Sequence, residues 1–288
     1  MIASGSDIQL YLPNVNWKMA TNRLDDFIEV AQNNLVNRVL GSTLETTLEV
    51  NVGETDSHAV LRALVKRVII TSAFLDAIPV LDLQLSEAGF VVQNNQAVSP
   101  ASKERVEQLK KAISQRKSQA LDILTRFLLD NSRDNNSMYP DWRGTEQFDH
   151  LSSGMIFGVE EYKRNFATVK SFQDVVMTWD GYYKMIPKMK VVLHGLVAEY
   201  ISEEYACELL EKKRDAETLI PVEREVLDYV CLAIVAGSID DNDLAHKMAI
   251  HANNIMKNHI DDFVTFSNSD KYKRTEINLG DGAVANML

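Results

Sequence analysis

Six histidines are the residues best suited to metal or acid–base chemistry, and three of them fall in one segment with helical periodicity. These are His246, His251 and His259, separated by five and then eight residues. Side chains share a helix face when they lie three or four residues apart, so this spacing distributes the three imidazoles around the helix. We therefore expect a solvated helix surface and no metal site.

Two acidic runs carry the oxygen ligands that calcium prefers. They are Asp134-Asn135-Asn136 and Asp240-Asp241-Asn242-Asp243. Neither run has the glycine and the closing glutamate that a calcium loop places at fixed spacing. We expect a turn for the first run and a helix cap for the second.

The sequence contains none of the common catalytic motifs: GxxxxGK[ST], GxGxxG, GxSxG and HExxH are all absent. The two cysteines, Cys207 and Cys231, lie beside apolar residues on expected helices, which predicts core packing for both. The sequence thus predicts no catalytic residue, no cofactor and no metal, and it favours a protein that is not an enzyme. Carboxylates and histidines are numerous enough to leave an enzyme with an unrecognised site as an alternative.

Composition describes an acidic globular chain. Its 288 residues include 30 Lys and Arg against 41 Asp and Glu, a net charge of -11, and 45% of them are hydrophobic. Such a chain repels nucleic acid unless its positive charge is concentrated locally. No apolar run approaches the ~18 residues of a membrane helix, and the N-terminus lacks the pattern of a secretory signal. We expect a protein that neither spans a membrane nor needs disulfides.

Positive charge is concentrated in one stretch and again near the C-terminus. The stretch 103–117 contains Lys103, Arg105, Lys110, Lys111, Arg116 and Lys117 against Glu104 and Glu107, and the tail carries Lys271, Lys273 and Arg274. Contact with nucleic acid or an acidic partner is one interpretation. An ordinary solvated helix face is the other.

Periodicity predicts a mainly α protein with one β-hairpin. Helices are expected over about 22–40, 43–49, 58–78, 100–130, 180–201, 202–213, 221–236 and 238–267. Pro79 is expected to end the third. Leu81, Leu83 and Leu85 alternate with polar residues, which predicts a strand, and Phe90-Val91-Val92 predicts its return.

Aromatic residues are concentrated between the two helical regions. The span 139–183 holds 10 of the 22 aromatic residues of the chain, including Trp142, Phe157 and Trp179. Interfaces and protein cores have similar composition, so this segment is either an interface anchor or a plug of core between the two halves.

The order of elements suggests an internal duplication. A helix of about five turns, a short helix, a loop and a hydrophobic helix occur twice, offset by about 160–165 residues. We expect a duplicated antiparallel helical-bundle unit with one β-hairpin, a long connecting helix and an extended C-terminal tail. The expected domains are a helical unit over 1–130 with its hairpin at about 80–93, an aromatic linker over 131–180, a second helical unit over 181–268 and a flexible arm over 269–288.

Several of these features together resemble a known group of proteins. The opening Asp7-Ile8-Gln9-Leu10-Tyr11-Leu12-Pro13, the helix ending in Leu40-Gly41, the segment LDLQLSEAGFVVQ and the run Ala101-Ser102-Lys103-Glu104-Arg105-Val106 resemble an uncharacterised protein family of Bacteroidales phages and prophages. The resemblance covers roughly residues 7–240. The first helical unit also resembles the α-helical head–tail connector (adaptor) proteins of tailed phages.

The second resemblance implies a structural role in the neck of a virion. It implies a ring homo-oligomer, twelve-fold in the connectors, that contacts a portal protein and tail or further neck proteins, with double-stranded DNA only as passing cargo. It places the protein in the virion neck, and in the host bacterial cytoplasm during assembly. Candidate contacts between subunits or with partners are Leu83, Phe90, Trp142, Phe157, Trp179, Lys271, Lys273 and Arg274. The alternative is a helical protein-interaction module, a regulator or chaperone encoded by a mobile element.

Overall fold

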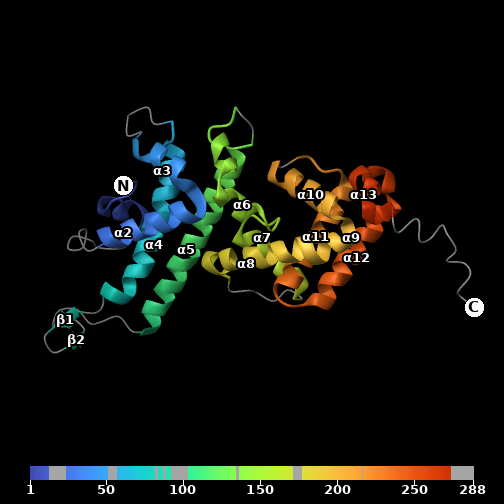
Figure 1. Ribbon diagram of the computed structural model, residues 1–288. Helices are drawn as coiled ribbons and strands as arrows, with labels where there is room; N and C mark the ends of the chain where they lie inside the picture. Colours follow the sequence, from blue (N-terminus) through green and yellow to red (C-terminus); the bar gives the residue numbers. More distant parts are fainter. Residues whose placement is uncertain are drawn as a thin grey trace, which may run out of the picture. The chain divides into compact units, whose positions relative to one another are not determined.

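The computed structural model describes residues 1–12, 24–50, 57–81, 84–86, 89–91, 103–133, 136–170, 177–215 and 217–273. The chain is mainly α-helical, as its periodicity predicts, and it divides into two compact units, Met1–Phe148 and Asp149–Leu288 (Figure 1). A search of the described helices for one long and apolar enough to cross a membrane finds none.

Unit 1 is built around one apolar helix. Its described helices are a 3-10 helix (Gly5–Asp7), α1 (Ile8–Tyr11), α2 (Asp25–Leu35), a π-helical turn (Val36–Leu40), α3 (Gly41–Val50), α4 (Ala59–Leu81), α5 (Lys103–Asp130) and a second 3-10 helix (Pro140–Gly144). Helix α4 packs against both α2 and α5. Every residue from Val68 to Phe74 is buried, because the middle of α4 has neighbours on all sides. Helix α6 (Glu146–Ser152) crosses the division between the units.

The end of α4 differs from the prediction. The helix continues through Pro79 to Leu81, so Leu81 is helical and is not part of a strand. A proline in the last turn removes only one backbone hydrogen bond, to the carbonyl four residues earlier, and the helix tolerates this so close to its end. Strands β1 (Gln84–Ser86) and β2 (Gly89–Val91) pair antiparallel, with Leu85 opposite Phe90. Leu83 and Val92 of the predicted hairpin lie outside the described residues.

Unit 2 also surrounds one apolar helix. Its helices are α7 (Val159–Val169), α8 (Trp179–Val191), a π-helical turn (Val192–Val197), α9 (Ala198–Ile201), α10 (Glu203–Asp215), α11 (Pro221–Ser238), α12 (Asn242–Asn258), a 3-10 helix (Ile260–Asp262) and α13 (Val264–Asn268). Helix α11 packs against α12, α7 and α8. A Cβ on Gly237 would stand 2.7 Å from Val192 Cγ1, so this glycine permits the close approach of α11 to the π-helical turn.

The last long helix of the prediction is divided in the structure. Helix α12 ends at Asn258, and His259 leaves the helical region of backbone conformation. The break turns the chain so that Phe263 and Phe266 become buried, and the Phe263 ring meets Tyr205 of α10 edge-on, with 5.4 Å between ring centroids. Burial of two aromatic rings offsets the hydrogen bonds lost at the break.

The aromatic span 131–180 is not a separate linker, because the division between the units falls inside it. Tyr139, Trp142 and Phe148 are buried in unit 1, and Tyr162 and Trp179 are buried in unit 2. These side chains form the interior of each unit. For them, burial supports the core interpretation of the span over the interface interpretation.

Each unit contains a similar backbone break among its described residues. Gly41 has φ 76° and ψ 163°, and it directly follows the π-helical turn of unit 1. Ser202 has φ 71° and ψ 153°, and it follows the π-helical turn and α9 in unit 2. A helix end leaves carbonyl groups without intrahelical donors. In unit 1 the Val39 carbonyl accepts a hydrogen bond of 2.7 Å from Trp142 Nε1, and in unit 2 the Tyr200 carbonyl accepts one from Asn253 Nδ2.

Gly41→Ala tests the break in unit 1. We expect the free energy of unfolding to fall by about 2 kcal/mol, because this backbone region is disfavoured for every residue except glycine. The added Cβ would also stand 3.1 Å from Gln147 Oε1. The control is Gly144→Ala, where a Cβ meets no atom within 4 Å. Urea unfolding followed by circular dichroism measures both, and equal losses for the two variants would contradict the assignment.

Candidate functional site

Among the described helices of unit 1, the N-terminal part of α5 is the longest segment without a buried residue. None of its residues from Lys103 to Ala112 is buried, and Ile113 is the first that is. From Ile113 onward, α5 contributes Leu121, Leu124 and Leu128 to the core. At about 1.5 Å per residue, the exposed part extends roughly 15 Å along the helix axis. Leu109 in this part keeps 43% of its surface accessible.

The exposed part of α5 carries most of the basic stretch that the sequence singles out. Lys103, Arg105, Lys111 and Arg116 are exposed, and Lys110 pairs with Glu107 at 2.9 Å. Its charge is opposite to the net charge of the chain, which is -11. A surface of this kind attracts acidic groups, whether they belong to nucleic acid or to an acidic protein face.

The other predicted contact in this region is the hairpin. Strands β1 and β2 form a two-stranded sheet, so among the described residues each strand has one edge without a strand neighbour. An open edge can accept a strand from another chain. Phe90 lies opposite Leu85 in the register, whereas Leu83 lies outside the described residues.

Trp142 and Trp179, which the sequence analysis named as candidate contacts, are core residues in the structure. Their accessible fractions are 1% and 2%. Trp142 donates to the Val39 carbonyl and packs edge-on against Phe148, with 5.3 Å between ring centroids. The Trp179 ring stacks on Tyr183. A side chain already covered by its own unit cannot contact a partner without unfolding.

The remaining predicted contact residues lie on unit 2. Phe157 is half-buried, and the Lys213 ammonium stands 5.8 Å from the centre of its ring. Lys271 and Lys273 are exposed, and Lys271 lies 6.0 Å from the centre of the Tyr200 ring. Arg274 lies outside the described residues. Of the eight predicted residues, Phe90 and Trp142 lie on unit 1, and Phe157, Trp179, Lys271 and Lys273 lie on unit 2.

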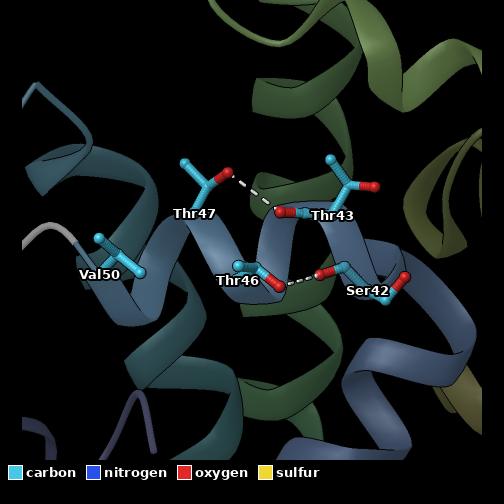
Figure 2. A pocket seen from close by; sticks show the side chains of 5 residues that line it. All are labelled: Ser42, Thr43, Thr46, Thr47 and Val50. Carbon is cyan, nitrogen blue, oxygen red and sulfur yellow. Dashed lines mark hydrogen bonds between the residues drawn. The ribbon is translucent and has the colours of Figure 1, made fainter.

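A shallow hollow on α3 is lined by hydroxyl groups. Ser42, Thr43, Thr46, Thr47 and Val50 line a space of about 550 Å³ (Figure 2). Thr46 Oγ1 donates to the Ser42 carbonyl and Thr47 Oγ1 donates to the Thr43 carbonyl, each at 3.0 Å. The five lining residues include no acid, base or metal ligand of the usual kinds. This hollow therefore offers hydrogen bonding and no acid–base chemistry.

Three potential metal ligands meet at the start of α10. His194, Glu203 and Cys207 each offer one donor atom, and the three atoms lie within 4.8 Å of one another. Cys207 is exposed, which corrects its predicted core packing, whereas Cys231 is buried as predicted. Partial desolvation, followed by the charges of Glu203 and Glu211, raises the pKa of the Cys207 thiol. The free thiol is therefore protonated at neutral pH.

Sequence reasoning did not find this cluster. Glu203 and Cys207 lie one helical turn apart on the predicted helix 202–213, and His194 lies on the preceding predicted helix. The sequence signal for the cluster is the spacing of four residues between Glu203 and Cys207, which places both side chains on one helix face. This spacing does not indicate that His194 lies nearby, because the break at Ser202 brings the two helical segments together.

Comparison with known families finds one match. Residues 25–151 match a family of unknown function (DUF6712). The match begins at the first residue of α2 and ends inside α6, so it covers most of unit 1 but less than half of the chain. No curated protein and no solved structure matches the chain.

Proposed function

We propose that this protein is a structural, non-catalytic subunit that assembles with copies of itself into a ring, as the head–tail connector in the virion neck of a tailed phage. The single observation that carries the assembly is the N-terminal part of α5. Ten consecutive residues of this helix are left out of the core of unit 1 and carry a charge opposite to that of the chain. The phage setting rests on the resemblance of the N-terminal segments described above.

Charge complementarity supports assembly between copies. In the proposed ring, the basic part of α5 contacts an acidic surface of the neighbouring copy. The two surfaces differ, so the contact is head-to-tail, and contacts of this type generate closed rings when the rotation closes. Opposite charges at such a contact accelerate association and select the correct partner. The open edges of β1 and β2 supply a second contact in this proposal.

We also propose that the two units arose by duplication. Gly41 and Ser202 have nearly the same backbone conformation after a π-helical turn. At the offset that aligns them, buried residues coincide along α3 and α10 and along α4 and α11: Leu48 with Leu209, Val65 with Val226, Ile69 with Val230, and Ala73 with Ile234. The carbonyl groups of Val39 and Tyr200, which also coincide, each accept a side-chain donor. Duplication of one unit accounts for the shared backbone break, the coinciding buried positions and the coinciding carbonyl acceptors.

Lys111→Glu tests the proposed contact. We expect the protein concentration at half-assembly to rise about tenfold or more, because the substitution places like charges across the contact. Arg126→Glu is the matched control, since it makes the same charge change on an exposed position of the core half of α5. Sedimentation velocity over a range of concentrations measures the effect.

The outcome separates the candidate functions. A larger shift for Lys111→Glu than for Arg126→Glu supports the ring. Assembly that is equally affected by both variants contradicts a role for the N-terminal part of α5. A wild-type protein that stays monomeric at all concentrations and binds one soluble partner would favour the alternative interaction module.

A further inference from the structure

We propose that His194, Glu203 and Cys207 bind a divalent transition metal ion of the zinc class on unit 2. His194 Nδ1 lies 2.6 Å from Glu203 Oε1, and Cys207 Sγ lies 3.9 Å from the same oxygen. The set therefore combines imidazole nitrogen, carboxylate oxygen and thiol sulfur. This inference does not depend on the proposed ring.

The fold of unit 2 brings the three side chains together. His194 lies in the π-helical turn Val192–Val197, Glu203 is the first residue of α10, and Cys207 follows Glu203 by one helical turn on the same face. The positive φ of Ser202 (71°) interrupts the helix between them. Two backbone features that are uncommon in a helical protein thus place ligands from two helical segments at one point.

The chemistry of this donor set fits zinc well. Zinc binds cysteine, histidine and carboxylate ligands in tetrahedral geometry, with bonds of about 2.0–2.3 Å. Such bonds place neighbouring donor atoms roughly 3.3–3.6 Å apart. This separation lies between the 2.6 Å from His194 Nδ1 to Glu203 Oε1 and the 3.9 Å from Cys207 Sγ to the same oxygen. The Glu203 side chain keeps 53% of its surface accessible, so it has the freedom to move by this amount.

Binding releases one proton to solvent and involves no redox step. The ion replaces the hydrogen bonds that Glu203 accepts from His194 Nδ1 and Cys207 Sγ. His194 then carries its proton on Nε2 instead of Nδ1, so that Nδ1 can bind the ion, and the Cys207 thiol releases its proton to solvent as the metal–sulfur bond forms. Three protein ligands leave a fourth position for water. The bound ion would connect α10 to the π-helical turn across the break at Ser202 and stabilise unit 2.

Cobalt(II) is a direct probe of the proposed site, because a cobalt–thiolate bond absorbs near-ultraviolet light. We expect metal-free full-length protein to develop this absorption with one equivalent of Co²⁺ and to lose it when Zn²⁺ is added. Cys207→Ser should abolish the band. His194→Gln should weaken Co²⁺ binding at least about tenfold.

Cys231→Ser is the matched control, because Cys231 is the second thiol of the chain and is buried. The proposal requires that this variant keep the full band. Zinc should also raise the Tm of the wild type and leave that of Cys207→Ser unchanged. This measurement is independent of the cobalt absorption band. Absence of the band at a tenfold excess of Co²⁺, or its loss in Cys231→Ser and retention in Cys207→Ser, would overturn the proposal.

Discussion

Trp142→Ala is expected to lower the free energy of unfolding by about 4 kcal/mol, the usual cost of removing a fully buried tryptophan. The Trp142 side chain connects the 3-10 helix Pro140–Gly144, which follows α5, to the end of the π-helical turn Val36–Leu40. It is 1% accessible, contacts Phe148 edge-on, and donates to the Val39 carbonyl at 2.7 Å. Truncation leaves both a cavity and a buried carbonyl without its donor. Urea unfolding of the full chain measures the loss.

A second substitution keeps the test informative if Trp142→Ala fails to fold. Trp142→Phe preserves most of the ring but removes the donor, so about 2 kcal/mol should be lost. Val60→Ala, at an exposed position of α4, is the control and should change stability little. If Trp142 were a contact residue, the other interpretation that the sequence left open, its removal would weaken assembly and leave the stability of the free chain unchanged.

Lys212→Met is expected to cost about 3 kcal/mol at neutral pH, because it leaves a buried carboxylate without its cation. Lys212 Nζ lies 2.6 Å from Glu208 Oε1 and 2.5 Å from Glu223 Oε1. The Glu223 side chain is only 10% accessible, and it also accepts a hydrogen bond from the Ile220 amide. These interactions join α10 to α11. The double substitution Lys212→Met/Glu223→Gln should recover about half of the loss.

Acid should reduce the cost of Lys212→Met. Burial raises the pKa of Glu208, but the hydrogen bonds from Lys212 and Thr265 lower it by more than burial raises it. The pKa of Glu208 in the folded chain therefore lies below its ordinary value of 4.5. A lowered folded pKa contributes stability above pH 4.5, and this stability is lost as the pH falls through the folded value. Unfolding of wild type and variant at pH 7 and at about pH 3.5 measures this. A cost that is the same at both pH values would contradict the ion-pair account.

Apolar periodicity was sufficient to predict the helices that form the centre of each unit. The predicted helix 58–78 corresponds to α4, whose Leu61, Val65 and Val68 are buried, and Cys231 was correctly assigned to the core of α11. Glycine marked the break at Gly41, because few other residues adopt its conformation. No comparable signal marked Ser202, since a serine in the left-handed region cannot be recognised from sequence.

Contacts distant in the sequence explain the predictions that were wrong. Trp142 reaches Val39, and Phe263 reaches Tyr205, through turns whose directions the local sequence does not determine. Cores and interfaces also share their aromatic composition, so burial alone could separate the two interpretations of Trp142 and Trp179. The cluster of His194, Glu203 and Cys207 was missed for the same reason, because it forms across a break.

Negative-stain electron microscopy of the purified protein, alone and with a candidate portal protein, tests the proposed function most directly. The proposal predicts rings with a central channel in at least one of the two samples, and it predicts that Lys111→Glu disrupts them while Arg126→Glu does not. Particles of one subunit in both samples, at concentrations where the protein is folded, would contradict assembly into a connector ring.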